Sequence, residues 1–523
     1  MGDVSTEVSA APRGSRLDEW YAGNPAARRV WRWGVPAAVL GVAAATRLWN
    51  LGHPDSLVFD ETYYVKDAWT LTNLGYESRW PEGADTAFNA GEVNGYTIEP
   101  SFVVHPPLGK WIIGAGLALV GADNPVGWRI GTAVCGILLV AVLMLIAWFL
   151  FRSTALTAIA GFLLAIDGNA IVMSRVALLD GILALFVLLG FGAILLDRGW
   201  TARRLRLWLA SRTDASRPTD WGPVLWWRPW LLVAGLTLGF AAAVKWNGLY
   251  FLAFFAVYTL VVDALDRRRL GIPFWISGTL LKQAPASFLL TVPVALVAYL
   301  ITWAGWFATD DGFYRHWVED GNLAWTGPLA WVPVDWQNFW HYQVSVYNYH
   351  VGETRPHSYQ ANPLTWLLLI RPTSMYYAGT EHGGTTYGST ILDLANPIIW
   401  WASVAAALYL VYRLIRFRDW RHGAILMGLL AGYLPWLMYL ERTVFQFYTI
   451  AFQSFLILAL TAVFGLMLGT PADPRWRRDG GIRLIAVILA VATAVSVFFW
   501  PIWTALEVPW SFIQLHYWLP NWR

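Results

Sequence analysis

Repeated apolar blocks, each roughly 16 to 25 residues long, constrain this chain more than any other feature. A block of that length matches the hydrocarbon thickness of a bilayer when it forms a helix. Inside a bilayer every backbone polar group needs a partner within the protein, which only helices and closed barrels provide. The sequence therefore predicts an all-α membrane protein with many spans, and a hydrophobic content of 57% over 523 residues agrees with this.

Eleven apolar blocks lie between charged loops. The expected spans cover residues 30–48, 129–151, 155–173, 181–196, 230–244, 248–262, 286–307, 397–412, 423–440, 444–468 and 482–503. One further block, residues 108–120, is short for a span, and we expect it to lie on the membrane surface. Many of the 35 Trp residues stand at the block ends, which is typical of an aromatic belt at the membrane interface.

The basic residues predict the orientation. With residues 108–120 outside the membrane, 25 of the 37 Lys and Arg residues fall on the side of the N-terminus and 12 on the other side. Because cytoplasmic loops carry the excess of basic residues, the N-terminus is expected in the cytoplasm. Two large loops, residues 50–128 and 308–396, are then outside, together with eight of the nine histidines. We expect the chemistry on that outer face.

The expected division of the chain has three parts. Residues 1–29 are predicted to be a disordered cytoplasmic tail, residues 30–503 a transmembrane catalytic domain, and residues 504–523 an outer C-terminal tail. The net charge of +3 is not concentrated on one segment, which argues against a nucleic-acid partner. The lone Cys135 lies in an apolar block, so no disulfide and no C-x-x-C site is expected.

An acidic pair, Asp60 and Glu61, follows the first apolar block. It begins a segment typical of a helix with an acidic N-cap, with Tyr64 on one face. The alternative is a carboxylate general base above the lipid headgroups. Asp180 allows the same two interpretations. Asp167, near the outer end of its expected span, is harder to explain by capping, because an unpaired carboxylate in a membrane costs several kcal/mol.

Several basic residues are expected at the outer membrane surface, at the depth of a lipid phosphate. They are Lys110, Arg129, Arg175, Arg371 and Arg442. Each alone is explained by snorkelling to the interface, whereas together they predict an anion clamp. Glu381 with His382, and His350 with Glu353, leave a divalent cation possible, but no metal-ligand spacing repeats and no metal site is predicted.

Three motifs in order resemble the protein O-mannosyltransferase family in its actinobacterial form. They are Asp60-Glu61, His105-Pro106-Pro107-Leu108-Gly109-Lys110 and Ser174-Arg175-Val176-Ala177-Leu178-Leu179-Asp180. The resemblance runs over roughly residues 30 to 500. It implies a GT-C glycosyltransferase fold with about eleven transmembrane helices, a polyprenyl-phosphate-mannose donor, and Ser or Thr hydroxyls of exported proteins as acceptors. The chain lacks the β-trefoil domain that eukaryotic members carry in the large outer loop.

The resemblance and the needs of the reaction together give each candidate residue a role. Asp60 is the expected general base for the acceptor hydroxyl. Glu61 is expected to orient the acceptor or the sugar, and Asp180 to position the peptide or a cation. The residues expected to hold the donor phosphate are Arg129, Lys110, His105, Arg175, Arg371 and Arg442. Tyr64 and Asp167 are expected to position the acceptor or the sugar.

Two other functions share some of these sequence features. A related GT-C transferase that moves arabinose or an aminosugar onto a lipid or polysaccharide would share the acidic loop, but not the full Pro-Pro and Leu-Leu-Asp set. A secondary transporter would use Asp167 and Asp180 for ion coupling, with broken helices in paired positions. Because most acidic residues lie in the outer loops, the sequence favours a multi-pass enzyme of the plasma membrane.

Overall fold

The computed structural model describes residues 23–212, 220–470 and 472–523. Of the expected N-terminal tail, residues 1–22 lie outside these ranges, but its last residues form helix α2 (Pro25–Arg29). This helix begins with Asn24 as its N-cap and continues through a π-helical turn, η1 (Val30–Gly34), into α3 (Val35–Leu48). The first span therefore begins earlier than expected.

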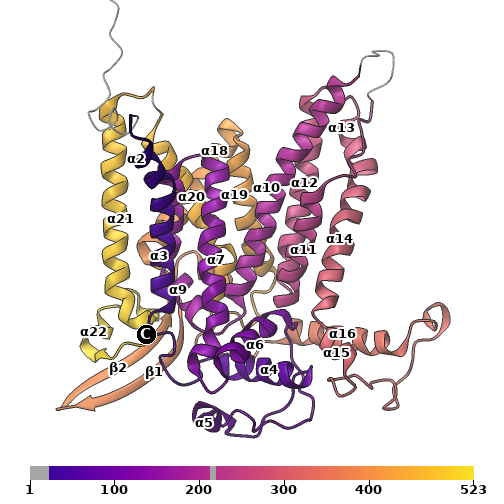
Figure 1. Ribbon diagram of the computed structural model, residues 1–523, viewed down its shortest axis with the longest axis vertical. Helices are drawn as coiled ribbons and strands as arrows, with labels where there is room; N and C mark the ends of the chain where they lie inside the picture. Colours follow the sequence, from indigo (N-terminus) through magenta and orange to yellow (C-terminus); the bar gives the residue numbers. More distant parts are fainter. Residues whose placement is uncertain (1–22, 213–219, 471) are drawn as a thin grey trace, which may run out of the picture.

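Long apolar helices form the bundle shown in Figure 1. They are α7 (Pro125–Phe151), α10 (Asp180–Ala210), α12 (Gly248–Arg269), α18 (Pro397–Phe417), α20 (Ile450–Leu468) and α21 (Arg475–Trp503). A seventh long apolar helix is continuous through α13 (Trp275–Ser277), η2 (Gly278–Gln283) and α14 (Ala284–Ile301). A broken span pairs α8 (Thr154–Ile166) with α9 (Gly168–Arg175) at an angle of 61°. Two shorter helices, α11 (Pro229–Val244) and α19 (Trp420–Tyr433), complete the bundle.

The number of spans is the point on which the sequence and the structure differ. Within the described ranges, seven helices are long and apolar enough to cross a membrane, or eight if the bent pair is one span. Each expected block is helical, but α3, α11 and α19 have only 14, 16 and 14 residues. The multi-span all-α architecture is confirmed, whereas the count of eleven is not.

One end of the bundle carries the segments that join the spans in the two large loops. There α4 (Glu61–Leu74), α5 (Ala84–Asn89), α6 (Leu108–Val120) and α16 (Val334–Gly352) lie below the long helices (Figure 1). Helix α6 packs so closely on α4 that a Cβ at Gly114 would stand 3.2 Å from the Ala68 carbonyl oxygen. As expected, residues 108–120 lie at this end. Short helices complete it: α15 (Ala304–Ala308), η3 (Gly327–Leu329), α17 (Pro363–Trp366), η4 (Leu434–Met438) and η5 (Gln446–Thr449).

A small antiparallel sheet at the same end was not predicted. It has the order β1-β2-β3, with β1 (Thr373–His382), β2 (Thr385–Asp393) and β3 (Val508–Pro509). The expected C-terminal tail supplies β3, α22 (Trp510–Gln514) and η6 (Pro520–Trp522). Trp522 is only 1% exposed, so this segment packs onto the domain and is not a free tail.

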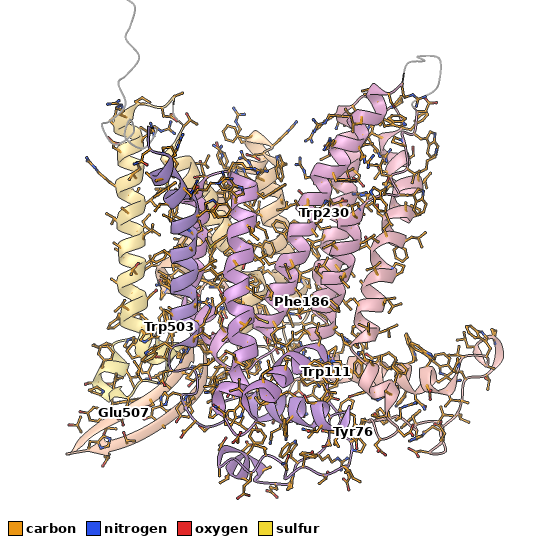
Figure 2. All side chains as sticks on the ribbon, in the orientation of Figure 1. Tyr76, Trp111, Phe186, Trp230, Trp503 and Glu507 are labelled. Carbon is orange, nitrogen blue, oxygen red and sulfur yellow. The ribbon has the colours of Figure 1, made fainter. Side chains whose placement is uncertain are left out.

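The hydrophobic core runs through the whole bundle, and a second small cluster joins Tyr342 of α16 to Trp303 and Trp306. Figure 2 shows Trp230 toward one end of the bundle and Trp111 toward the other, with Phe186 between them. This division places the polar segments, and with them most of the candidate residues, at the end that holds α4 and α6.

Candidate active site

The carboxylate of Glu61 is fully buried and fully paired. It accepts hydrogen bonds from Nε and Nη2 of Arg129, both at 2.8 Å, and from the backbone N–H groups of Ala177 (2.8 Å) and Val58 (3.0 Å). A buried carboxylate needs this degree of compensation. Glu61 therefore ties the loop before α4 to α7 and to the loop before α10, and it does not face a substrate, contrary to the expected orienting role.

Arg129 has no donor left for a phosphate. Besides the two bonds to Glu61, its Nη1 donates to the carbonyls of Leu51 (3.4 Å) and Pro54 (2.7 Å), and its Nη2 to that of Ser56 (2.9 Å). A guanidinium carries five N–H donors, and these contacts use all of them. The expectation that Arg129 binds the donor phosphate is wrong in this structure.

Asp60, the neighbour of Glu61, has the opposite surroundings. It occupies the N-cap position of α4, but its side chain makes no capping hydrogen bond. Burial raises the pKa of the Asp60 carboxyl to about 6, although Lys245 and the Tyr64 hydroxyl, which donates a hydrogen bond to it, act in the other direction; Asp180 raises this pKa further. The capping interpretation is thus wrong for Asp60, and its carboxylate is a weakly compensated proton acceptor.

Asp180 and Lys245 form a buried ion pair next to Asp60. The Lys245 ammonium donates to both carboxylate oxygens of Asp180, at 3.0 and 2.9 Å, and lies 4.4 Å from the centre of the Tyr448 ring. Asp180 is the first residue of α10, and Lys245 directly follows α11. An ammonium has three N–H donors, so one remains beyond this bidentate contact. The capping interpretation of Asp180 is therefore wrong, because its carboxylate pairs with Lys245.

Two histidines and an arginine stand beside Lys245. The His105 ring stacks on the His350 ring, with centroids 5.2 Å apart. The Tyr64 ring also contacts His105, with a centroid distance of 6.0 Å. Nε2 of His350 lies 2.8 Å from the Val104 carbonyl oxygen, and its Nδ1 lies 3.1 Å from Nη2 of Arg442. Because Arg442 is a donor only, Nδ1 of His350 accepts and its Nε2 carries the proton.

Both imidazoles are neutral. Burial, and then the charge of Arg442, lower the pKa of His350 to about 4. Burial and the charge of Lys245 lower the pKa of His105 well below its usual value. Nδ1 of His105 is buried and has no hydrogen-bond partner. Buried polar atoms are rarely unpaired, so this nitrogen is available to a ligand.

These groups line a cavity of about 290 Å³ that also holds Trp246, Tyr347 and Tyr448. A second cavity, of about 940 Å³, shares Trp246, Leu249 and Tyr347 with it and runs between α11, α12, α14 and α16. Its other walls are almost entirely apolar, for example Leu252 and Leu296. A charged cavity therefore adjoins an apolar groove along the membrane-spanning helices.

Four further candidate residues serve the fold. Lys110 is 1% exposed and ion-pairs with Glu77. Arg175 donates to the carbonyls of Arg47, Trp49 and Asn50 and thereby completes the C-terminal end of α3. Neither lines the charged cavity.

Arg371 and Asp167 are also engaged elsewhere. Arg371 donates to the carbonyls of Ser358 and Asn521, which fastens the C-terminal segment. Asp167 caps α9 through Ala170 (3.3 Å) and accepts from Asn396 N (3.0 Å) and Gln453 Nε2 (2.6 Å). Among the expected site residues, Asp60, Asp180, Tyr64, His105 and Arg442 are the ones that come together.

Sequence reasoning missed Lys245, His350 and Tyr448 as members of this site. Lys245 directly follows the apolar block that ends at Val244, and a lysine at that depth was a signal for a buried ion pair. His350 was considered only as a metal ligand. Within the described ranges, no group of three His, Cys, Asp or Glu residues is arranged to hold a metal ion.

Family models match both halves of the chain. One, described as dolichyl-phosphate-mannose-protein mannosyltransferase, covers residues 37–308. The other, the C-terminal four TMM region of protein-O-mannosyltransferase, covers residues 335–522. A curated relative from Mycolicibacterium smegmatis, named polyprenol-phosphate-mannose–protein mannosyltransferase, is 34% identical over 95% of this chain and 94% of its own length. A relative of the same name from Mycobacterium tuberculosis is 33% identical over 95% and 92%.

Solved structures share the fold. The Saccharomyces cerevisiae protein O-mannosyltransferase Pmt1-Pmt2 complex, bound to the sugar donor, superposes with a TM-score of 0.66 at 14% identity, covering 93% of this chain and 92% of that one. An oligosaccharyltransferase from Archaeoglobus fulgidus gives a TM-score of 0.50 at 17% identity, covering 91% and 57%. At these identities the likeness concerns the fold alone.

The arrangement around Arg129 yields a stability prediction. Arg129→Met removes the partner of the buried Glu61 carboxylate, and breaking such a pair costs about 3 to 5 kcal/mol. We expect a clearly lower thermal unfolding midpoint for the purified protein. Arg79→Met, which breaks an exposed ion pair with Glu99, is the matched control and should leave the midpoint nearly unchanged. An unchanged midpoint for Arg129→Met, together with a raised donor KM, would instead assign Arg129 to the phosphate.

Proposed function

Because this chain belongs to the protein O-mannosyltransferase family, we propose that it transfers mannose from a polyprenyl-phosphate-mannose donor to Ser or Thr hydroxyls of exported proteins. Two relatives that carry this activity in their names align over 95% of the chain. The observation that carries the proposal is the position of Asp60 within electrostatic range of the Asp180–Lys245 pair, whose Lys245 lines a charged cavity that shares a wall with an apolar groove.

The donor is proposed to bind across the two cavities. Its phosphate takes the smaller cavity, where Lys245 has a spare donor and Arg442 is held by His350. Neutral His105, with its unpartnered Nδ1, adds a hydrogen bond without adding charge. The prenyl chain takes the apolar groove of about 940 Å³. The shared wall of Trp246, Leu249 and Tyr347 joins the two parts, as a lipid with a charged head requires.

The chemistry proposed for the site is a single displacement with inversion at the anomeric carbon. The acceptor oxygen forms the new bond to that carbon while the bond from the carbon to the phosphate oxygen breaks. The electron pair leaves with polyprenyl phosphate, whose developing charge Lys245 and Arg442 stabilise. Asp60 takes the proton of the acceptor hydroxyl as general base. A phosphate leaves without a proton donor, so one carboxylate is enough, unlike the pair used in glycoside hydrolysis.

Asp60 is suited to this role by its surroundings. A carboxylate with a pKa of about 6 is a stronger base than an ordinary aspartate and is still ionised at neutral pH. Lys245 keeps the carboxylate charged, and Tyr64 fixes its orientation through a hydrogen bond. Asp180 is proposed to hold Lys245 in place rather than to react. No step of this scheme uses a metal ion.

The site is proposed to face the outside of the plasma membrane, with the N-terminus in the cytoplasm. Support comes from the excess of basic residues on the side of the N-terminus, 25 of 37 Lys and Arg residues. The end that carries α4, α6 and α16 then meets exported proteins directly, and a sugar donor there has to arrive on lipid.

The base assignment predicts the behaviour of one variant. Asp60→Asn keeps the size of the side chain but removes the proton acceptor, so transfer should fall by roughly 10² to 10⁴. Donor binding and the unfolding midpoint should be retained. Asp55→Asn, which changes an exposed carboxylate in the same loop, is the control and should keep full activity. Near wild-type transfer by Asp60→Asn would show that Asp60 is not the base.

The orientation predicts a labelling pattern. In a Cys135→Ser background, a cysteine is placed either at Leu323, 95% exposed beside α16, or at the exposed Arg475 at the start of α21. A membrane-impermeant maleimide applied to intact cells should label the cysteine at 323 only. Lysed cells should show both. Labelling at 475 in intact cells would reverse the proposed orientation.

A further inference from the structure

The β1–β2 hairpin is a rigid element with a fixed register. Its two-residue turn, Gly383-Gly384, has φ angles of +59° and +78°, which is the type I′ turn that joins tightly paired strands. His382 and Thr385 flank the turn and form the first pair of the ladder. In an antiparallel ladder hydrogen-bonded pairs alternate with non-hydrogen-bonded ones, so the register decides which backbone groups point outward.

The β1 edge of this sheet has backbone N–H and C=O groups that do not pair with another strand in the described ranges. The strand order is β1-β2-β3, and within the described ranges no other strand pairs with β1. Counting from the turn, Tyr377, Gly379 and Glu381 direct their N–H and C=O groups away from β2. On the opposite edge, β3 pairs with β2 at Tyr387 and Gly388. The largely exposed part of this edge, from Tyr377 to His382, is a ready template for another extended chain.

The β1 edge has little of the usual protection against such pairing, because its bulge, between Ser374 and Tyr376, is confined to the base of the hairpin. Its sequence, TSMYYAGTEH, contains no Lys and no Pro, the residues that most often block an edge. The hairpin is also held in place from its other side. Glu507 accepts a hydrogen bond from the Thr380 hydroxyl and contacts His382, and Tyr377 packs against Trp510. Figure 2 shows Glu507 beside the hairpin. The edge is therefore both open and preorganised.

The base of the hairpin reaches the neighbourhood of the candidate site. Thr373, the first residue of β1, pairs with Asp393, the last residue of β2, and both are buried. Burial raises the pKa of Asp393 well above its usual value, and the charges of Asp167 and Asp180 add to this, so Asp180 lies within electrostatic range. From Thr373 to Tyr377 a strand extends by about 13 Å. The outward groups thus begin one four-residue strand length beyond the buried base of the hairpin, a distance that four residues of an extended peptide also span.

We propose that β1 binds the acceptor polypeptide as an added strand, so that main-chain hydrogen bonds to Tyr377, Gly379 and Glu381 hold a segment next to the reacting Ser or Thr. This inference rests on the proposed function, because it names how the acceptor of that reaction is held. Strand addition takes its affinity from the peptide backbone, which every sequence has. It selects for extended, unfolded segments and tolerates many sequences, and it gives the 308–396 loop a role.

The first test uses the peptide and leaves the enzyme intact. A synthetic Thr-containing peptide of about 12 residues is labelled with a fluorophore, and its binding to the full-length protein is followed by anisotropy, separately from mannose transfer. Single N-methyl groups are then placed along the residues that flank the Thr on each side. On one side, methylation should weaken binding about three- to tenfold at every second residue and hardly at the residues between. Equal effects at neighbouring positions would overturn strand addition.

The second test uses two prolines that face opposite ways across one pair. Glu381 and Thr386 are cross-strand partners, both exposed, and both have N–H groups that point out of the hairpin, toward opposite edges. Glu381→Pro should weaken peptide binding about three- to tenfold, whereas Thr386→Pro should not. Glu381→Ala separates the lost charge from the lost N–H and should bind like wild type.

The outcomes separate this inference from the proposed function. A period-two pattern in binding without any mannose transfer would contradict the proposed function and still support strand addition. Equal peptide binding by Glu381→Pro and Thr386→Pro would overturn strand addition even if transfer is found. Self-association that Glu381→Pro abolishes, with peptide binding unchanged, would assign the edge to a second copy of this chain and also overturn the proposal.

Discussion

Compensation of buried charge is the constraint on which this structure depends. Two adjacent carboxylates, Asp60 and Glu61, illustrate it. Glu61 receives four hydrogen bonds and anchors the loop, while Asp60 keeps only weak compensation. Because Glu61 and Arg129 fix the backbone on which Asp60 stands, a fully satisfied pair holds a poorly satisfied carboxylate in place. This arrangement holds a carboxylate with a raised pKa in a partly buried position.

The same principle explains what the sequence could and could not predict. Apolar blocks, basic clusters and the acidic loop were sufficient to predict a multi-span helical protein with its polar chemistry at one end. The hydrogen-bond partner of each arginine was not predictable, because it depends on which groups the fold brings close to the guanidinium. Arg129 and Arg175 meet the free carbonyls of distant segments, whereas Arg442 meets a histidine. The β1–β2 hairpin was not predicted, because its Gly-Gly turn lies within a long loop rich in aromatic residues.

The arrangement gives each proposed substrate its own route. The apolar groove lies between α11, α12, α14 and α16 and is the route proposed for the lipid donor. The hairpin lies at the end of the bundle that holds α4 and α6 (Figure 1), which is the end proposed to face outward and to meet the polypeptide. Asp60 lies within electrostatic range of the Asp180–Lys245 pair, and Lys245 lines the charged cavity beside the groove. In this account Lys245 has two tasks, since it holds the donor phosphate and keeps the base ionised.

The dependence of transfer on pH tests that coupling most directly. Below the pKa of Asp60 the base is protonated, so kcat/KM for the acceptor should fall about tenfold per pH unit below about pH 6 and level off above it. Lys245 lowers this pKa, so Lys245→Met should move the inflection to higher pH, in addition to weakening donor binding. A profile that is flat from about pH 5 to 8, or an inflection that stays in place in Lys245→Met, would contradict the account.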